Sequence, residues 1–195
     1  MRSRPFLALA LLVASLSPLA AQPGPMRARD RFAVIIGGEE FPLVVIGADG
    51  NATFPVIGAV RVAGLIPLEA ERAVLEAMRG ISARPDITVR ALRRVVVEGE
   101  VARTEVLYVE DGTTVSEAIV RAGGVTFIGD RTRVELRRSG RPVATLDVRG
   151  GDDRLTTLQS GDEVVVRRLP WYARSGVILT SVVTTVVSWL VIGAR

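Results

Sequence analysis

The chain has 195 residues, enough for one medium domain or two small ones. It carries 25 basic and 21 acidic residues, so the net charge is only +4, and it contains neither cysteine nor histidine. These absences exclude disulfides and thiolate nucleophiles and remove the usual general base and the commonest metal ligand. Because the arginines are scattered among acids, no nucleic-acid partner is indicated.

The N-terminus predicts a secretory signal peptide over residues 1–21. Arg2 and Arg4 form its positive region, an apolar run follows, and Leu19-Ala20-Ala21 offers a cleavage site. The alternative is a first membrane helix. The apolar run is too short for that and is interrupted by serine and proline, so we expect cleavage and secretion across the inner membrane.

The first elements after the signal peptide are expected to be a linker and strands. Residues 22–30, with two prolines and a glycine, predict a flexible linker, and strands are expected over residues 32–36 and 41–46. Asp49-Gly50 then predicts a turn, since glycine accepts a positive φ. Pro55 ends the short strand that follows, because it has no N–H to donate to a ladder.

A reversal, a helix and a further strand complete this first unit. Gly58 allows a sharp turn into the next strand, and residues 67–79 read as a helix. Proline suits its first turn, and an apolar stripe runs along it: Leu68, Val74, Leu75 and Met78. Alternation of apolar and polar residues over 87–91 predicts a half-buried strand.

In this order, the features resemble the export domain of bacterial outer-membrane polysaccharide export proteins (Wza-type). That family reads as Asp-Gly, a short strand, a proline and glycine around apolar residues, an alternating strand ending in Gly-Leu, a helix, and a proline before another alternating strand. The matching residues here are Asp49, Gly50, Pro55, Gly58, Val60, Val62, Gly64, Leu65, Pro85, Ile87 and Val89. The resemblance implies an export domain over residues 31–91.

A second unit is predicted over residues 92–168. Strands are expected at 95–101 and 106–109, and Thr114 with Glu117 forms a capping box at the start of an amphipathic helix. The helix buries every third or fourth residue, as Val115, Ala118, Ile119 and Ala122 indicate.

The remainder of this unit predicts a β-grasp order. A left-handed cap at Gly123-Gly124 ends the helix, a ribbon turns at Ser139-Gly140, and residues 158–166 lead into a last buried strand. The unit resembles the soluble-ligand-binding β-grasp domain that follows the export domain in the same family. The matching residues are Val97, Gly99, Glu100, Val101, Asp111, Gly112, Thr114, Ala118, Ala122, Gly123, Gly124, Leu158, Gly161, Asp162, Val164 and Val166.

The C-terminal segment predicts a transmembrane helix over residues 176–194, after a linker at 169–175. The segment has no charge and as a helix is roughly 28 Å long, close to a hydrocarbon core of about 30 Å. Trp171 and Tyr172 at one end and Trp189 near the other suit the membrane interfaces. A buried core helix or strand is the alternative. The expected fold class is thus α+β: an export domain, a β-grasp domain and a C-terminal transmembrane helix.

Hydroxyl residues gather on one side of this helix. At 100° per residue they occupy an arc of about 140°; they are Thr180, Ser181, Thr184, Thr185 and Ser188. Such a stripe is a possible pore lining in a ring of helices. Its alternative is plain helix–helix packing, in which serine and threonine are common.

The sequence predicts no catalytic site. Glu98 and Glu100 share one face of a strand, but a solvated or oligomer-contacting face explains them better than a carboxylate pair. Asp152-Asp153 is expected to be a charged loop and not a cation site. No triad is available without histidine. We therefore expect no enzyme, no cofactor and no metal.

The resemblance implies an oligomeric conduit for capsular or extracellular polysaccharide. Its domains would stack as homo-oligomeric rings in the periplasm, its C-terminal helices would cross the outer membrane in contact with lipid, and an inner-membrane polysaccharide co-polymerase would be its partner. The alternative is a membrane-tethered β-grasp receptor for a carbohydrate or other ligand, without transport. An inner-membrane tether would leave Arg167, Arg168 and Arg174 outside, against the positive-inside bias, so the outer membrane is favoured.

Overall fold

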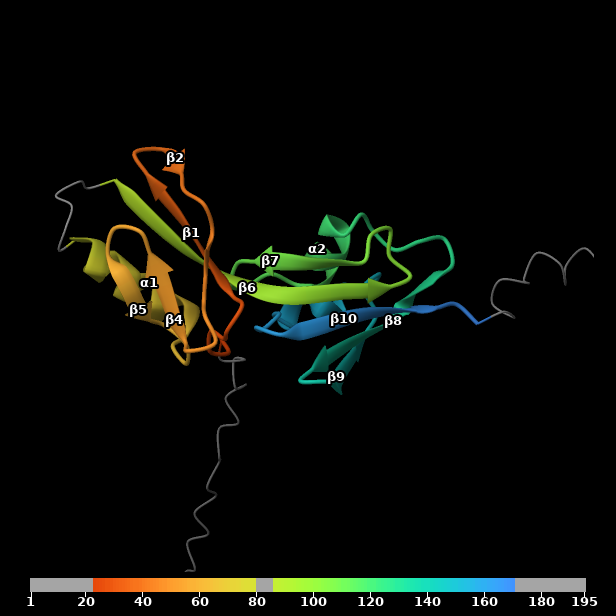
Figure 1. Ribbon diagram of the computed structural model, residues 1–195. Coiled ribbons are helices and arrows are strands. Elements are labelled where there is room, and N and C mark those ends of the chain that lie inside the picture. Colours follow the sequence, from red (N-terminus) through yellow and green to blue (C-terminus); the bar gives the residue numbers. More distant parts are fainter. Residues whose placement is uncertain (1–22, 80–85, 171–195) are drawn as a thin grey trace, which may run out of the picture.

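The computed structural model describes residues 23–79 and 86–170. Two lobes lie side by side, and the long strand β6 (Ile87–Gly99) runs from the first into the second (Figure 1). The expected signal peptide (1–21) and transmembrane helix (176–194) lie outside the described residues. Among the residues that are described, no helix is long and apolar enough to cross a membrane.

The first lobe is a small sheet, a hairpin and a helix. Strand β1 pairs antiparallel with the first half of β6, from Arg31 opposite Leu92 to Ile36 opposite Ile87. Its elements are β1 (Arg31–Ile36), β2 (Glu39–Glu40), β3 (Val44–Val45), β4 (Asn51–Phe54), β5 (Gly58–Arg61) and α1 (Pro67–Arg79). Phe32, Phe54, Val62, Val74 and Val89 are among the side chains that form its core.

Most of the expected turns and bounds in this lobe are confirmed. The helix has the predicted ends, β4 stops one residue before Pro55, and Gly58 has a φ of +77° at the reversal into β5. Two details differ. The strand expected over 41–46 shrinks to β3, because only Arg31 and Phe32 of β1 pair with it. Leu68, expected in the apolar stripe, is exposed, and Ala70 is buried in its place.

The flexible linker expected at residues 22–30 is wrong for the described part, 23–30. Met26 is buried in the first core, and its backbone exchanges hydrogen bonds with the chain before α1: its N–H donates to Leu65 O, and its carbonyl accepts from Gly64 N–H. Asp30 is buried as well. The prolines and the glycine correctly predict a segment without regular secondary structure. The segment is nevertheless packed on the first lobe, because Met26 and Asp30 are buried.

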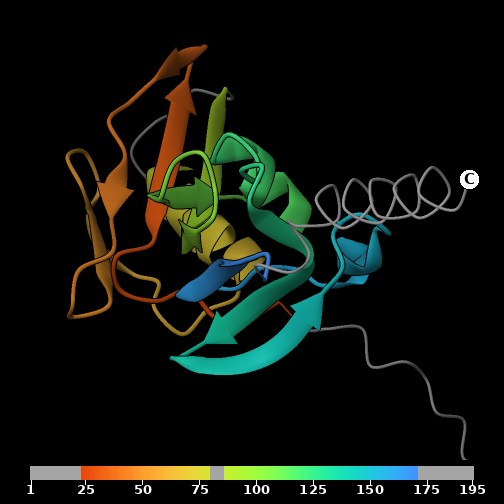
Figure 2. The same cartoon turned by 90° about the vertical axis from the view of Figure 1, so that its right-hand side faces the viewer.

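The second lobe is a five-strand sheet covered by one helix. It uses the second half of β6 with β7 (Glu105–Val109), α2 (Val115–Arg121), β8 (Gly129–Arg138), β9 (Arg141–Leu146), the short 3₁₀ helix η1 (Asp152–Leu155) and β10 (Asp162–Arg168). The order is β7-β6-β10-β8-β9, with β6 and β10 parallel at the centre. Along the chain, the paired strands β6 and β7, helix α2 and strands β8 to β10 follow one another in the β-grasp order that the sequence predicts. Figure 2 shows β8 and β9 curving together as a ribbon.

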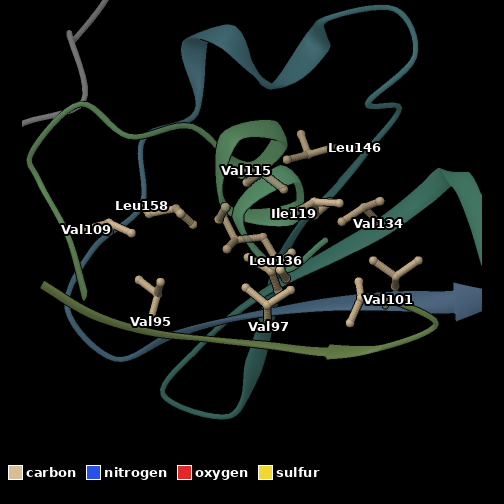
Figure 3. Close-up of a cluster of buried hydrophobic side chains, with 14 residues drawn as sticks. Val95, Val97, Val101, Val109, Val115, Ile119, Val134, Leu136, Leu146 and Leu158 are labelled. Atoms are coloured by element: carbon tan, nitrogen blue, oxygen red, sulfur yellow. The ribbon is translucent and has the colours of Figure 1, made fainter. Parts of the chain in front are cut away.

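Helix α2 is held as the capping box predicts. The Thr114 hydroxyl accepts the Glu117 N–H at 3.3 Å, and the Glu117 carboxylate accepts the Thr114 N–H at 3.1 Å. Val115 and Ile119 point from the helix toward Val97 of β6, with Leu136 of β8 between them (Figure 3). The apolar face of the helix and the sheet therefore form one core.

Candidate functional site

A polar cluster joins the two lobes, and all of its side chains are buried except that of Asp111, which is 45% exposed. We call it the seam cluster; its members are Asp30, Arg93, Asp111, Ser160 and Asp162. They come from the residue before β1, the middle of β6, the loop after β7 and the turn that leads into β10. These four places are far apart in the sequence, so the cluster exists only in the folded chain.

Arg93 is the centre of the seam cluster. Its side chain is fully buried, and its guanidinium donates to Leu158 O at 2.7 Å and to Gly24 O at 3.1 Å. It also forms an ion pair with Asp111, 2.9 Å from Nη1 to Oδ1. A single side chain thus links the N-terminal segment, the central strand and the turn before β10.

Asp30 supplies the matching negative charge from the first lobe. Its Oδ1 accepts the N–H of Arg94 at 2.7 Å, and its Oδ2 accepts the N–H of Arg27 at 2.7 Å together with the Ser160 hydroxyl. Because the carboxylate satisfies backbone donors on both sides of the seam, it fixes the start of β1 against β6 and the turn before β10.

Burial perturbs both central charges. It raises the pKa of Asp30, although the hydrogen bonds from Ser160, Arg27 and Arg94 act in the opposite direction. Burial likewise lowers the pKa of Arg93, while the nearby carboxylates raise it. Each ion therefore depends on its partners in the cluster, since an isolated buried charge is strongly unfavourable.

The turn before β10 closes the seam cluster. Asp162 is buried, accepts the N–H of Gln159 at 2.8 Å, and binds the Arg138 guanidinium through two bonds of 2.8 Å each. Gly161 donates its N–H to Arg94 O at 2.8 Å. This geometry fixes the relative position of the lobes, and of the cluster's side chains only Asp111 reaches solvent.

Sequence reasoning missed Asp30, Arg93 and Ser160. A signal for Arg93 was available, because it stands in the alternation of β6 between Ala91 and Val95, both of which are buried. An arginine at an inward position of an apolar strand indicates a buried partner. Asp30 and Ser160 gave no such signal, since each lies in irregular chain.

An apolar groove of about 430 Å³ lies on the first lobe. The loop from Phe41 to Val45 forms one side, the β4–β5 hairpin the other, and Met78 of α1 lies against it. Phe41 and Val56 are exposed at its rim, 44% and 65% respectively. With only Thr53 to offer a side-chain hydroxyl, this lining suits an apolar surface and not a hydroxyl-rich polymer.

Comparison with protein families finds a matching family for each of the two lobes. Residues 21–92 match the family described as Polysaccharide biosynthesis/export protein, and residues 94–147 match the SLBB domain. The chain belongs to the polysaccharide export protein family. The seam cluster therefore lies between the export domain and the SLBB domain, and the resemblance found in the sequence is confirmed.

Two curated relatives are similar over most of the two domains. An EPS I polysaccharide export outer membrane protein, EpsA, from Ralstonia solanacearum is 31% identical over 140 residues, which is 67% of this chain and 37% of the relative. EpsA from Ralstonia nicotianae is 32% identical over 134 residues, 64% of this chain and 35% of the relative. The matched region thus spans little more than a third of these relatives.

The residues singled out from the sequence have different positions in the fold. The predicted pore-lining residues lie outside the described residues: Thr180, Ser181, Thr184, Thr185 and Ser188. Glu100 accepts the Thr126 hydroxyl at 3.1 Å and lies 3.6 Å from the Arg168 guanidinium. No group of three acidic residues that could hold a metal ion occurs within 23–79 and 86–170.

The charged loop expected at Asp152-Asp153 is wrong for Asp153. This carboxylate is buried and accepts the Ser116 N–H at 2.7 Å, in the first turn of α2. The residues form the 3₁₀ helix η1, which packs against the start of α2. Asp153 therefore caps a helix from a distance of 37 residues along the chain, a role that no local motif reveals.

Proposed function

We propose that this chain is a subunit of an oligomeric conduit that exports capsular or extracellular polysaccharide and has no catalytic activity of its own. The observation that carries the proposal is the export domain followed directly by an SLBB domain, in a chain similar to two EPS I polysaccharide export outer membrane proteins. The described fold adds a structural reason, because a conduit needs rigid subunits.

Rigidity between the two domains has two sources. Strand β6 belongs to both sheets, pairing with β1 through Leu92 and with β7 from Arg93 onward, so no linker separates the domains. The seam cluster then adds buried ionic and hydrogen-bonded contacts around Arg93. A subunit built this way holds one angle between its domains, as stacked rings of export and SLBB domains require.

The C-terminal segment is the proposed membrane part of the conduit. Residues 176–194 would cross the outer membrane as helices, with the hydroxyl stripe of Thr180, Ser181, Thr184, Thr185 and Ser188 toward a water-filled centre. The domains would lie in the periplasm after removal of residues 1–21. The partners would be polysaccharide, membrane lipid, identical subunits and an inner-membrane polysaccharide co-polymerase.

Single cysteines test this arrangement, because the natural chain has none. Thr184 lies near the middle of the stripe, and Val186 is 200° away at 100° per residue. In cells that export the polymer, a membrane-impermeant thiol reagent should label Thr184→Cys and not Val186→Cys. A bulky adduct at position 184 should also reduce surface polysaccharide.

Other outcomes would count against the conduit. If neither cysteine reacts and the purified chain has the native mass of a monomer, the membrane-tethered receptor becomes the better description. Labelling of Val186→Cys alone would place the wrong face toward water. Deletion of the gene should stop surface polysaccharide while its synthesis enzymes remain present, and unchanged export after deletion would refute the proposed function.

A further inference from the structure

The tight turn between α2 and β8 carries the most exposed of the large apolar side chains in the described residues. Phe127 is 93% exposed and occupies the first central position of a turn closed by a hydrogen bond from Gly129 N–H to Thr126 O. A single exposed phenylalanine needs no explanation by itself. Its surroundings in this fold, however, are specific.

The turn is held firmly. Thr126 donates its N–H to Glu100 O at 3.0 Å and its hydroxyl to the Glu100 carboxylate at 3.1 Å. On the other side, Gly129 is buried and pairs with Arg168 of β10. Because both flanks are hydrogen-bonded to neighbouring elements, the turn holds the backbone of Phe127 at the surface, with its ring exposed.

This turn lies where the chain leaves the described fold. The Leu169 N–H donates to Ile128 O at 2.8 Å, so the end of β10 and the turn are bound to each other. Figure 1 shows them at the same end of the second lobe. The sequence that follows contains Trp171 and Tyr172 and then the uncharged residues 176–194.

A cationic side chain lies beside the turn. Arg168 pairs with Gly129 at the end of β10, and its side chain is 59% exposed and lies 3.6 Å from a Glu100 oxygen. An aromatic tip beside an exposed arginine matches a membrane surface, where aromatic rings sit at the headgroup level and basic residues meet anionic lipid.

We infer that the turn Thr126–Gly129 is a second membrane contact of this chain, with Phe127 inserted into the headgroup region of the bilayer that residues 176–194 enter. The occupant of this surface is lipid. The contact would fix the SLBB domain at a constant height and tilt beneath its membrane segment. This inference rests on the membrane placement of the C-terminal segment under the proposed function.

Three single-cysteine variants of the full chain, labelled with the fluorophore NBD and reconstituted into phosphatidylcholine–phosphatidylglycerol vesicles, test the inference. Phe127→Cys reports on the turn, Val186→Cys on the C-terminal segment, and Val56→Cys serves as control. Val56 is also an exposed apolar residue in a tight turn, but it lies on the export domain. The quencher is lipid brominated near the headgroup end of its acyl chains, with deeper bromination as a second sample.

The expected result is that the shallow quencher removes more than half of the emission at position 127 and leaves position 56 unchanged. Quenching at 186 without quenching at 127 would overturn the inference and leave the proposed function intact. Absence of quenching at 186 would count against the membrane placement itself. A blue-shifted label at 127 that no brominated lipid quenches would mean that protein covers Phe127, which also overturns the inference.

Discussion

Asp30 and Ser160 share a buried hydrogen bond, although 130 residues separate them in the chain. The first residue stands before the first strand of the export domain, and the second stands before the last strand of the SLBB domain. Their contact joins the beginning of the first domain to the end of the second. Either side chain can be removed by a single substitution, so the contribution of each to stability can be measured separately.

Removal of the Asp30 carboxylate should destabilise the chain strongly. Asp30→Ala leaves the part-buried N–H groups of Arg27 and Arg94 without their acceptor, so we expect a loss of about 3 kcal/mol in the free energy of unfolding. Ser160→Ala removes one hydroxyl donor and should cost about 1 kcal/mol. Denaturant unfolding followed by circular dichroism measures both. Asp147→Ala, which removes only a local exposed contact with Arg149, should have little effect.

The pH dependence of stability should differ in sign between two aspartates. Burial raises the pKa of Asp30 above its ordinary value of 3.8. As the pH rises above about 3.8, Asp30 therefore loses its proton in the unfolded chain before it does so in the folded chain. This difference lowers the free energy of unfolding of the wild type as the pH rises. The cost of Asp30→Asn should consequently be largest at acid pH and shrink toward neutral pH.

Asp49 is the matched control for that pH series. Hydrogen bonds from the N–H and the side chain of Asn51 lower the pKa of Asp49 below the same ordinary value of 3.8. Its stabilising contribution is present above about pH 3.8 and is lost as the pH falls. The cost of Asp49→Asn should therefore grow toward neutral pH, and parallel slopes for the two variants would contradict the assigned environments.

Two glycines with the same backbone conformation should respond differently to alanine. Gly99 and Gly112 have φ of +89° and +82°, so alanine at either is strained by about 1–2 kcal/mol. A β-carbon at Gly99 would also lie 2.2 Å from Val166 O, whereas nothing lies within 4 Å at Gly112. Gly99→Ala should disrupt the β6–β10 pairing and unfold the SLBB domain at lower denaturant concentration than Gly112→Ala. Equal midpoints would show that Val166 moves freely.

The buried face of α2 should dominate its contribution to stability. Ile119→Ala removes a packed side chain from the core in Figure 3 and should cost about 2–5 kcal/mol. The neighbouring residue Val120 is 72% exposed, so Val120→Ala should change the free energy of unfolding by less than about 0.5 kcal/mol. Comparable losses for the two variants in a urea melt would mean that the helix presents a different face.

The sequence alone was sufficient for the local elements and the domain order. The bounds of α1, the strand end before Pro55 and the capping box at Thr114 were predictable, because each depends on residues close together in the chain. The order of the β-grasp elements along the chain was predictable in the same way, but not which strands lie side by side in the sheet. Proline lacks an N–H and therefore cannot donate to a strand ladder in any fold. A threonine hydroxyl three residues before a glutamate likewise can cap the start of a helix in any fold.

Only the tertiary structure decided how the two domains are joined. Residues 23–30 look like a linker by composition, yet Asp30 is buried, because its acceptors meet donors of Arg94 and Ser160 that folding brings to it. Asp153 likewise looks like part of a charged loop until the start of α2 is placed beside it. The free energy of such polar residues depends on the partners available after folding, and those partners are distant in sequence, so local patterns cannot reveal them.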